Sequence, residues 1–142
     1  MASDFISGAC PLFVPLVENG YVDRQNPVTR MVAEEYLAPI RAAGVDTLIL
    51  GCTHYPVIAP ILADVMGEGV TLVDSGKAAA DYARSMLAEA GLLTGRKSRG
   101  SCSYYVSDAP DDFARNASIF LGERFGGEVG RIEITNYPDT IV

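Results

Sequence analysis

The residues best suited to chemistry lie in the segment 48–56, where Cys52 and His54 stand two positions apart. A cysteine thiolate can accept a proton, and a nearby histidine can exchange one with the thiol or with a substrate group. His54 is the only histidine of the chain. Thr53, between them, offers a hydroxyl and a backbone N–H to a carboxylate. The pattern therefore indicates an acid–base site, although a packed cysteine with His54 as a helix cap would give the same sequence.

The flanking residues predict that Cys52 lies at the carboxyl end of a buried strand. Residues 45–50 are short, apolar and rich in β-branched side chains, as in a buried parallel strand. Gly51 allows a sharp turn or the close approach of a substrate. Pro56 then opens a helix that ends near Gly67. Ligands of open α/β sheets bind at this end of the strands, and the positive end of the following helix favours a thiolate.

Strand-like and helix-like segments alternate along the chain, which predicts an α/β fold with a mainly parallel sheet and helices on both faces. Asn26 and Pro27 mark the start of a helix that Gly44 stops. The further expected elements are strands at 70–73, 102–106 and 131–135 and helices at 77–90 and 110–121. The polar stretch 94–101 is rich in Gly and Ser and predicts a linker or loop between the segments 1–93 and 102–142.

Composition limits the classes of function. The 142 residues are 49% hydrophobic and 20% charged, which suits a folded core and excludes a disordered chain. A net charge of −7 argues against a nucleic-acid partner. The longest uncharged apolar stretch, 8–17, is too short for a membrane span. Three cysteines without a CxxC pair indicate a reducing, cytoplasmic setting, and one histidine leaves too few ligands for a structural zinc site.

The N-terminal residues predict association. Residues 1–8 are strand-like, and the apolar segment 13–17 has little preceding chain to cover it. We therefore expect self-association through the region 5–17, or a polypeptide that belongs before Met1. Cys10 and Cys102 are expected to be small buried hydrophobic side chains.

Four ordered blocks of the chain resemble bacterial glutamate racemases. They are residues 44–56 (GVDTLILGCTHYP), which resemble the second catalytic-cysteine motif, residues 9–18, which resemble the upstream block, and residues 34–37 and 72–76. The resemblance covers about 7–93, and more weakly the C-terminal part through 104–108. The family chain is about twice this length, so this sequence resembles its C-terminal half and lacks the half that carries the other catalytic cysteine.

The resemblance implies an amino-acid racemase without a cofactor or metal, which interconverts L- and D-glutamate and supplies D-glutamate for peptidoglycan. In the family, two cysteines on opposite sides of the substrate Cα remove and return the proton. Cys52 corresponds to the second of these, and Cys52 and Thr53 would contact glutamate. His54 would assist Cys52 or the ammonium group, and Glu18 matches the acidic residue that works with that histidine. The fragment alone is expected to be inactive, with the missing N-terminal half or a second copy as its partner.

Three other functions stay open at this point. The chain could belong to a racemase of aspartate or another amino acid, although aspartate racemases usually carry a glutamate at the position of His54. It could be a hydrolase or transferase with Cys52 as nucleophile, but no oxyanion-hole motif supports acyl transfer. It could also be a non-catalytic module that self-associates.

Overall fold

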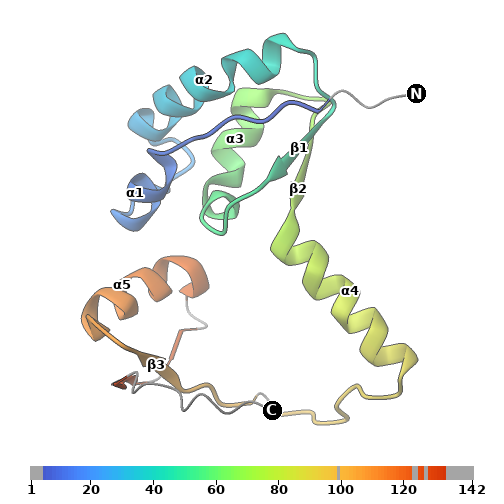
Figure 1. Cartoon of the computed structure of the whole chain (residues 1–142), viewed down its shortest axis with the longest axis vertical. Coiled ribbons are helices and arrows are strands. Elements are labelled where there is room, and N and C mark those ends of the chain that lie inside the picture. Colours follow the sequence, from blue (N-terminus) through green and yellow to red (C-terminus); the bar gives the residue numbers. More distant parts are fainter. Residues whose placement is uncertain (1–4, 99, 123–124, 127, 134–142) are drawn as a thin grey trace, which may run out of the picture. The chain divides into compact units, whose positions relative to one another are not determined.

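The computed structural model describes residues 5–98, 100–122, 125–126 and 128–133. The chain divides into two compact units, Met1–Gly95 and Arg96–Val142, which we describe separately. The first unit contains α1 (Phe13–Glu18), α2 (Pro27–Ala42), β1 (Thr47–Leu50), the 3-10 helix η1 (Tyr55–Ile58), α3 (Ala59–Met66), β2 (Thr71–Asp74) and α4 (Ser75–Glu89), and the second contains β3 (Tyr104–Val106), α5 (Pro110–Leu121) and β4 (Val129–Arg131) (Figure 1). None of the described helices is long and apolar enough to cross a membrane.

Strands β1 and β2 pair in parallel, with Thr47 opposite Thr71 and Leu50 opposite Asp74. A parallel pair needs a crossover, which η1 and α3 supply. The carboxyl ends of both strands therefore lie at the same edge of the pair. There the hydroxyl of Ser75, the first residue of α4, donates to the carbonyl oxygen of Leu50 at 3.5 Å. The predicted α/β fold with parallel strands is confirmed.

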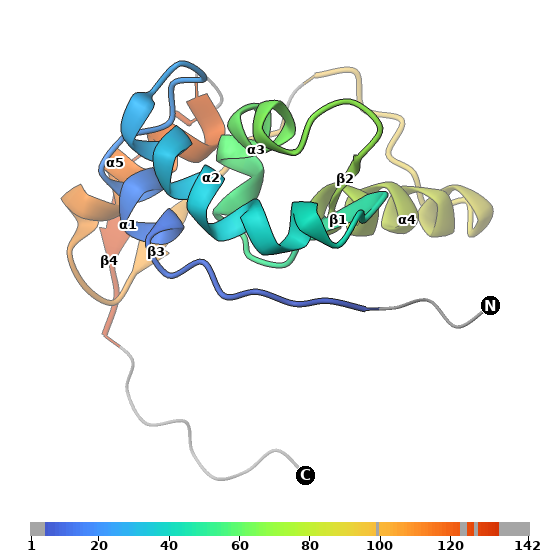
Figure 2. The same cartoon turned by 90° about the horizontal axis from the view of Figure 1, so that it is seen from above.

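Helices α2 and α3 pack against each other and form the main core of the first unit (Figure 2). As predicted, Asn26 caps α2: its side-chain oxygen accepts the N–H groups of Val28 and Thr29 at 3.1 Å. The guanidinium of Arg41 donates to the carbonyl oxygen of Val65 at 3.0 Å and ties the two helices together. The apolar side chains buried in these helices are Ala33, Leu37, Ile40, Ile61, Leu62, Val65 and Met66.

Helix α1 buries residues that the sequence was expected to expose. Phe13 and Val17 are 1% and 0% exposed, so the expected exposure of the segment 13–17 is wrong for both. The reason is that the segment coils into a helix, where positions i and i+4 share one face. That face packs on α2 and η1, and Phe13 lies edge-on to the rings of Tyr36 and Tyr55. The expected self-association surface therefore loses its central apolar residues.

The residues before α1 form no strand in the part that the structure describes. Residues 5–10 have no regular secondary structure, so the predicted strand at 1–8 is wrong for 5–8, and residues 1–4 lie outside the described part. Phe5 and Ile6 are 82% and 45% exposed, as the sequence led us to expect.

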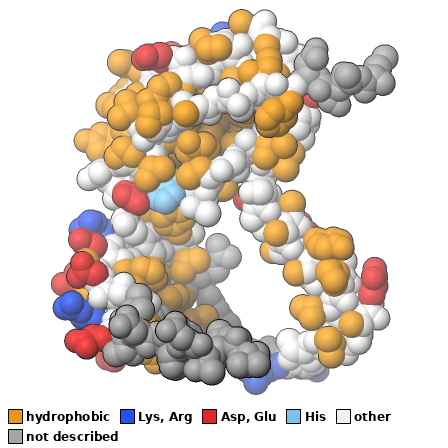
Figure 3. All heavy atoms as spheres, in the orientation of Figure 1, with side chains coloured by type: hydrophobic (Ala, Val, Ile, Leu, Met, Phe, Trp, Pro, Cys, Tyr) orange, Lys and Arg blue, Asp and Glu red, His pale blue; other side chains and the backbone are white. Residues whose placement is uncertain are grey.

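Helix α4 has no buried residue. Its apolar side chains, among them Tyr82, Met86 and Leu87, are exposed, and Figure 3 shows hydrophobic side chains gathered along this helix. Asp74 caps it by accepting the N–H of Lys77 at 3.1 Å. The described residues of the first unit therefore leave the apolar face of α4 uncovered.

The second unit is a strand–helix–strand unit with β3 and β4 in parallel. The ring of Tyr104 packs against Phe113 and Phe125, with centroids 6.0 and 5.1 Å away. Strand β3 is shorter than the predicted 102–106. Strand β4 begins before the predicted 131–135, of which residues 134–135 lie outside the described part.

Candidate active site

The turn that follows β1 carries three of the four predicted site residues. The N–H of Tyr55 donates to the carbonyl oxygen of Cys52 at 3.2 Å, and the N–H of Val57 donates to that of His54 at 3.1 Å. These two backbone hydrogen bonds close the turn. Cys52 is partly buried.

Glu18, the last residue of α1, reaches this turn from 36 residues away in the sequence. Its Oε1 lies 2.9 Å from Nε2 of His54, whose side chain is 20% exposed. An ionised carboxylate can only accept hydrogen bonds, so Nε2 must carry the proton of this contact. In the neutral imidazole, Nδ1 is then the acceptor.

The Nδ1 atom of His54 faces the other two site residues. It lies 3.9 Å from Sγ of Cys52 and 3.2 Å from Oγ1 of Thr53. A proton can therefore pass from the Cys52 thiol to Nδ1, and Glu18 stabilises the imidazolium that forms. The structure brings all four predicted residues together in one hydrogen-bonded group, which can take up or release a proton at sulfur.

The helix that was expected to start at Pro56 starts differently. Residues Tyr55–Ile58 form a 3-10 turn, and the α-helix begins only at Ala59. The positive end of α3 therefore lies seven residues beyond Cys52 in the sequence. His54 replaces the helix end as the group that can stabilise a Cys52 thiolate.

Sequence reasoning missed two contacts of Tyr55 that support the site. The hydroxyl of Tyr55 donates to the carbonyl oxygen of Cys10 at 3.3 Å, and the ring of Tyr55 packs edge-on against Phe13. Both partners are more than 40 positions away in the sequence, so no local pattern indicates them. Among the described residues, no group of three or more His, Cys, Asp or Glu side chains is placed to hold a metal ion.

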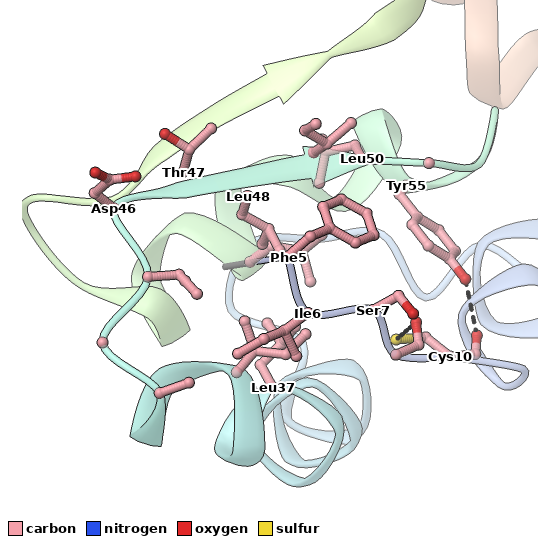
Figure 4. A pocket seen from close by; sticks show the side chains of 18 of the residues that line it. Phe5, Ile6, Ser7, Cys10, Leu37, Asp46, Thr47, Leu48, Leu50 and Tyr55 are labelled. Carbon is pink, nitrogen blue, oxygen red and sulfur yellow. Dashed lines mark hydrogen bonds between the residues drawn. The ribbon is translucent and has the colours of Figure 1, made fainter. Parts of the chain in front are cut away.

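The first unit also contains an open pocket of about 850 Å³ beside β1. Residues 5–8, the end of α2 and the strand itself line it, and Figure 4 shows Tyr55 and Cys10 at one end. Among the described residues of this lining, Asp46 is the only one with a charged side chain, and Cys52, Thr53 and His54 do not belong to it. The pocket is thus distinct from the acid–base group.

The other two cysteines differ in their surroundings. Cys10 is 5% exposed, as expected, and burial raises the pKa of its thiol. Cys102 is exposed, so its expected burial is wrong. It lies before β3, in a stretch without regular secondary structure.

Alkylation with iodoacetamide should label Cys10 most slowly of the three cysteines in the folded chain, because only the thiolate reacts. In the unfolded chain, the thiol of Cys10 loses its proton at a lower pH than it does in the folded chain. Below about pH 8.5, the ordinary pKa of a cysteine, the thiol is neutral in both states and its contribution to the stability of the folded chain is fully present. As the pH rises from there through the raised pKa of folded Cys10, ionisation favours the unfolded chain and that contribution is lost. Mass spectrometry of labelled peptides measures the rates, with urea-unfolded chain as control. Fast labelling of Cys10 in the folded chain would contradict its burial.

Three comparisons relate this geometry to known proteins. The sequence model of the family described as Asp/Glu/hydantoin racemase matches residues 9–83. The glutamate racemase of Geobacter metallireducens is 43% identical over 87% of this chain and 45% of its own length. That of Chlorobaculum tepidum is 45% identical over 80% of this chain and 41% of its own length. The chain thus spans about half the length of the curated relatives it matches.

Two solved structures of glutamate racemases are also similar to this chain. The glutamate racemase of Thermus thermophilus, in complex with β-chloro-D-alanine, is 38% identical, with a TM-score of 0.76 over 89% of this chain and 47% of that one. That of Francisella tularensis, in complex with D-glutamate, is 34% identical, with a TM-score of 0.70 over 92% of this chain and 46% of that one.

Proposed function

Because the chain belongs to the Asp/Glu/hydantoin racemase family, we propose that it supplies one of the two proton-transfer faces of a glutamate racemase. The observation that carries this proposal is the hydrogen-bonded group of Glu18, His54 and Cys52 at the carboxyl end of β1. Glutamate is the proposed substrate, since the similar proteins are glutamate racemases and one was solved with D-glutamate.

In the proposed reaction, Cys52 works on one face of the substrate Cα. As a thiolate it takes the Cα proton, so that the C–H bond breaks, an S–H bond forms and the electron pair stays on the substrate, spread onto its carboxylate. A second group on the opposite face then delivers a proton to Cα, which inverts the centre. In the reverse direction, the Cys52 thiol is the proton donor.

The neighbours of Cys52 have separate roles in this proposal. His54 is the group that can receive the thiol proton, because its Nδ1 lies 3.9 Å from Sγ, and Glu18 can stabilise the charge that forms on the ring, because it lies 2.9 Å from Nε2. Thr53 contacts the substrate carboxylate through its hydroxyl and backbone N–H. Neutralising that carboxylate matters because an amino-acid Cα–H is a far weaker acid than a thiol, and a preorganised polar site supplies part of the difference.

The proposed partner is a polypeptide like the preceding half of the relatives, which would provide the second face. Residues 102–142 would pack on that polypeptide, with 94–101 as the connecting loop. A reducing cytoplasm would keep Cys52 as a free thiol, and D-glutamate for peptidoglycan would be the product.

Complementation tests the proposal. The part of the Geobacter metallireducens glutamate racemase that precedes the matched segment is produced together with this chain, and glutamate interconversion is followed by circular dichroism. The pair should racemise glutamate, and Cys52→Ala should lower the rate at least about a hundredfold, as expected for the loss of a positioned acid–base group. Cys102→Ala is the matched control. Equal activity with Cys52→Ala would refute the assignment of Cys52.

A further inference from the structure

We propose that Tyr55 is a positioning residue, which holds the helix that carries Glu18 against the turn that carries Cys52 and His54. This inference rests on the proposed function only in assigning a purpose to the acid–base group. The group itself depends on a contact between two segments that are far apart in the sequence, α1 and the turn after β1. Tyr55 directly follows His54 in the sequence, and its side chain contacts Phe13 in α1 and the backbone of Cys10 just before α1.

The hydroxyl of Tyr55 provides the first link. It donates to the carbonyl oxygen of Cys10 at 3.3 Å, across 45 residues of sequence (Figure 4). The same carbonyl oxygen accepts the N–H of Phe13, the first residue of α1, at 3.1 Å. The hydroxyl of Tyr55 is therefore hydrogen-bonded to the backbone at the N-terminus of α1. Burial raises the pKa of Tyr55, so its hydroxyl keeps its proton to a higher pH than the hydroxyl of an exposed tyrosine does.

The ring of Tyr55 provides the second link. It lies edge-on to the ring of Phe13, with centroids 5.3 Å apart and planes at 89°. Phe13 is buried and belongs to the same six-residue helix as Glu18. On its other side, Phe13 contacts the ring of Tyr36 from α2, at 5.5 Å. Phe13 is thus held between two tyrosines, of which only Tyr55 belongs to the turn.

These links matter because the contact between Glu18 and His54 tolerates little movement. Oε1 and Nε2 are 2.9 Å apart, and a shift of about 1 Å takes a hydrogen bond out of its effective range. The Glu18 side chain is 42% exposed. The anchoring of α1 to the turn therefore decides whether Glu18 remains at Nε2 and whether Nδ1 remains the acceptor for Cys52.

Cysteine alkylation tests the inference without substrate or activity. We compare Tyr55→Phe, which removes the hydroxyl and keeps the ring, with Tyr36→Phe, which makes the same change in the other tyrosine against Phe13. The readout is the iodoacetamide rate of Cys52 divided by that of exposed Cys102 in the same chain. Tyr55→Phe should lower this ratio roughly fivefold, the effect of one lost hydrogen bond. Tyr36→Phe should leave it unchanged.

A double-mutant cycle separates positioning from general destabilisation. If Tyr55 acts through Glu18, then Tyr55→Phe should have no further effect on Cys52 in a chain that already carries Glu18→Gln. An equal slowing in that background would overturn the inference, as would an equal effect of Tyr36→Phe. A Tyr55→Phe chain that does not fold would also overturn it, because the hydroxyl would then be structural. If complementation fails while the double-mutant cycle gives the expected result, the proposed racemase function is refuted and the positioning role of Tyr55 is not.

Discussion

Glutamate incubated with the 142-residue chain alone should keep its configuration. Inversion requires an acid and a base on opposite faces of Cα, and the structure joins one cysteine, Cys52, to a histidine and a carboxylate. Cys10 is buried, and Cys102 belongs to the other unit. A single thiol that removes a proton and returns it to the same face regenerates the starting enantiomer. At most, slow exchange of the Cα proton with solvent should occur.

Two measurements on the same sample distinguish exchange from inversion. In D₂O, proton NMR follows the loss of the Cα–H signal, and circular dichroism follows the configuration. Any exchange should disappear in Cys52→Ala and persist in Cys102→Ala, because Cys52 is the thiol that lies beside His54 and Glu18. Rapid interconversion of L- and D-glutamate that depends on Cys52 would show that a second copy, Cys10 or Cys102 provides the other base.

The local part of the site could be predicted from the sequence, and its long-range part could not. Cys52, Thr53 and His54 are adjacent, and the strand before them has a clear pattern, so their placement at a strand end follows from local rules. Glu18 was identified by family resemblance alone, since nothing in its surroundings marks it. Its contact with His54 depends on how α1 packs, as does that of Tyr55 with Cys10.

The same distinction holds for the fold. The cap at Asn26 and the start of β2 near residue 70 follow from local hydrogen bonding and side-chain pattern, and both agree with the structure. Whether a side chain is buried depends on which other parts of the fold pack against it. Phe13 was expected to be exposed and is buried by Tyr36 and Tyr55, whereas Cys102 was expected to be buried and is exposed. Apolar character alone decides neither case.

Phe13→Ala should destabilise the first unit by about 3–5 kcal/mol, because it removes a fully buried aromatic side chain and leaves a cavity between two rings. Such a loss is a large part of the roughly 5–15 kcal/mol that stabilises a typical domain. Urea unfolding followed by circular dichroism measures the change. Tyr82→Ala is the matched control: this ring is 68% exposed on α4, and its removal should change the stability by less than about 0.5 kcal/mol.

The two variants also test how the site depends on packing. Phe13 anchors the helix that ends at Glu18, so in chains that remain folded, Phe13→Ala should slow the alkylation of Cys52 as well. Tyr82→Ala should leave that rate unchanged. If Phe13→Ala costs less than about 1 kcal/mol, the helix α1 is not held by this ring, since such a small value is typical of an exposed site. The position of Glu18 would then need another explanation than the packing of Phe13 between Tyr36 and Tyr55.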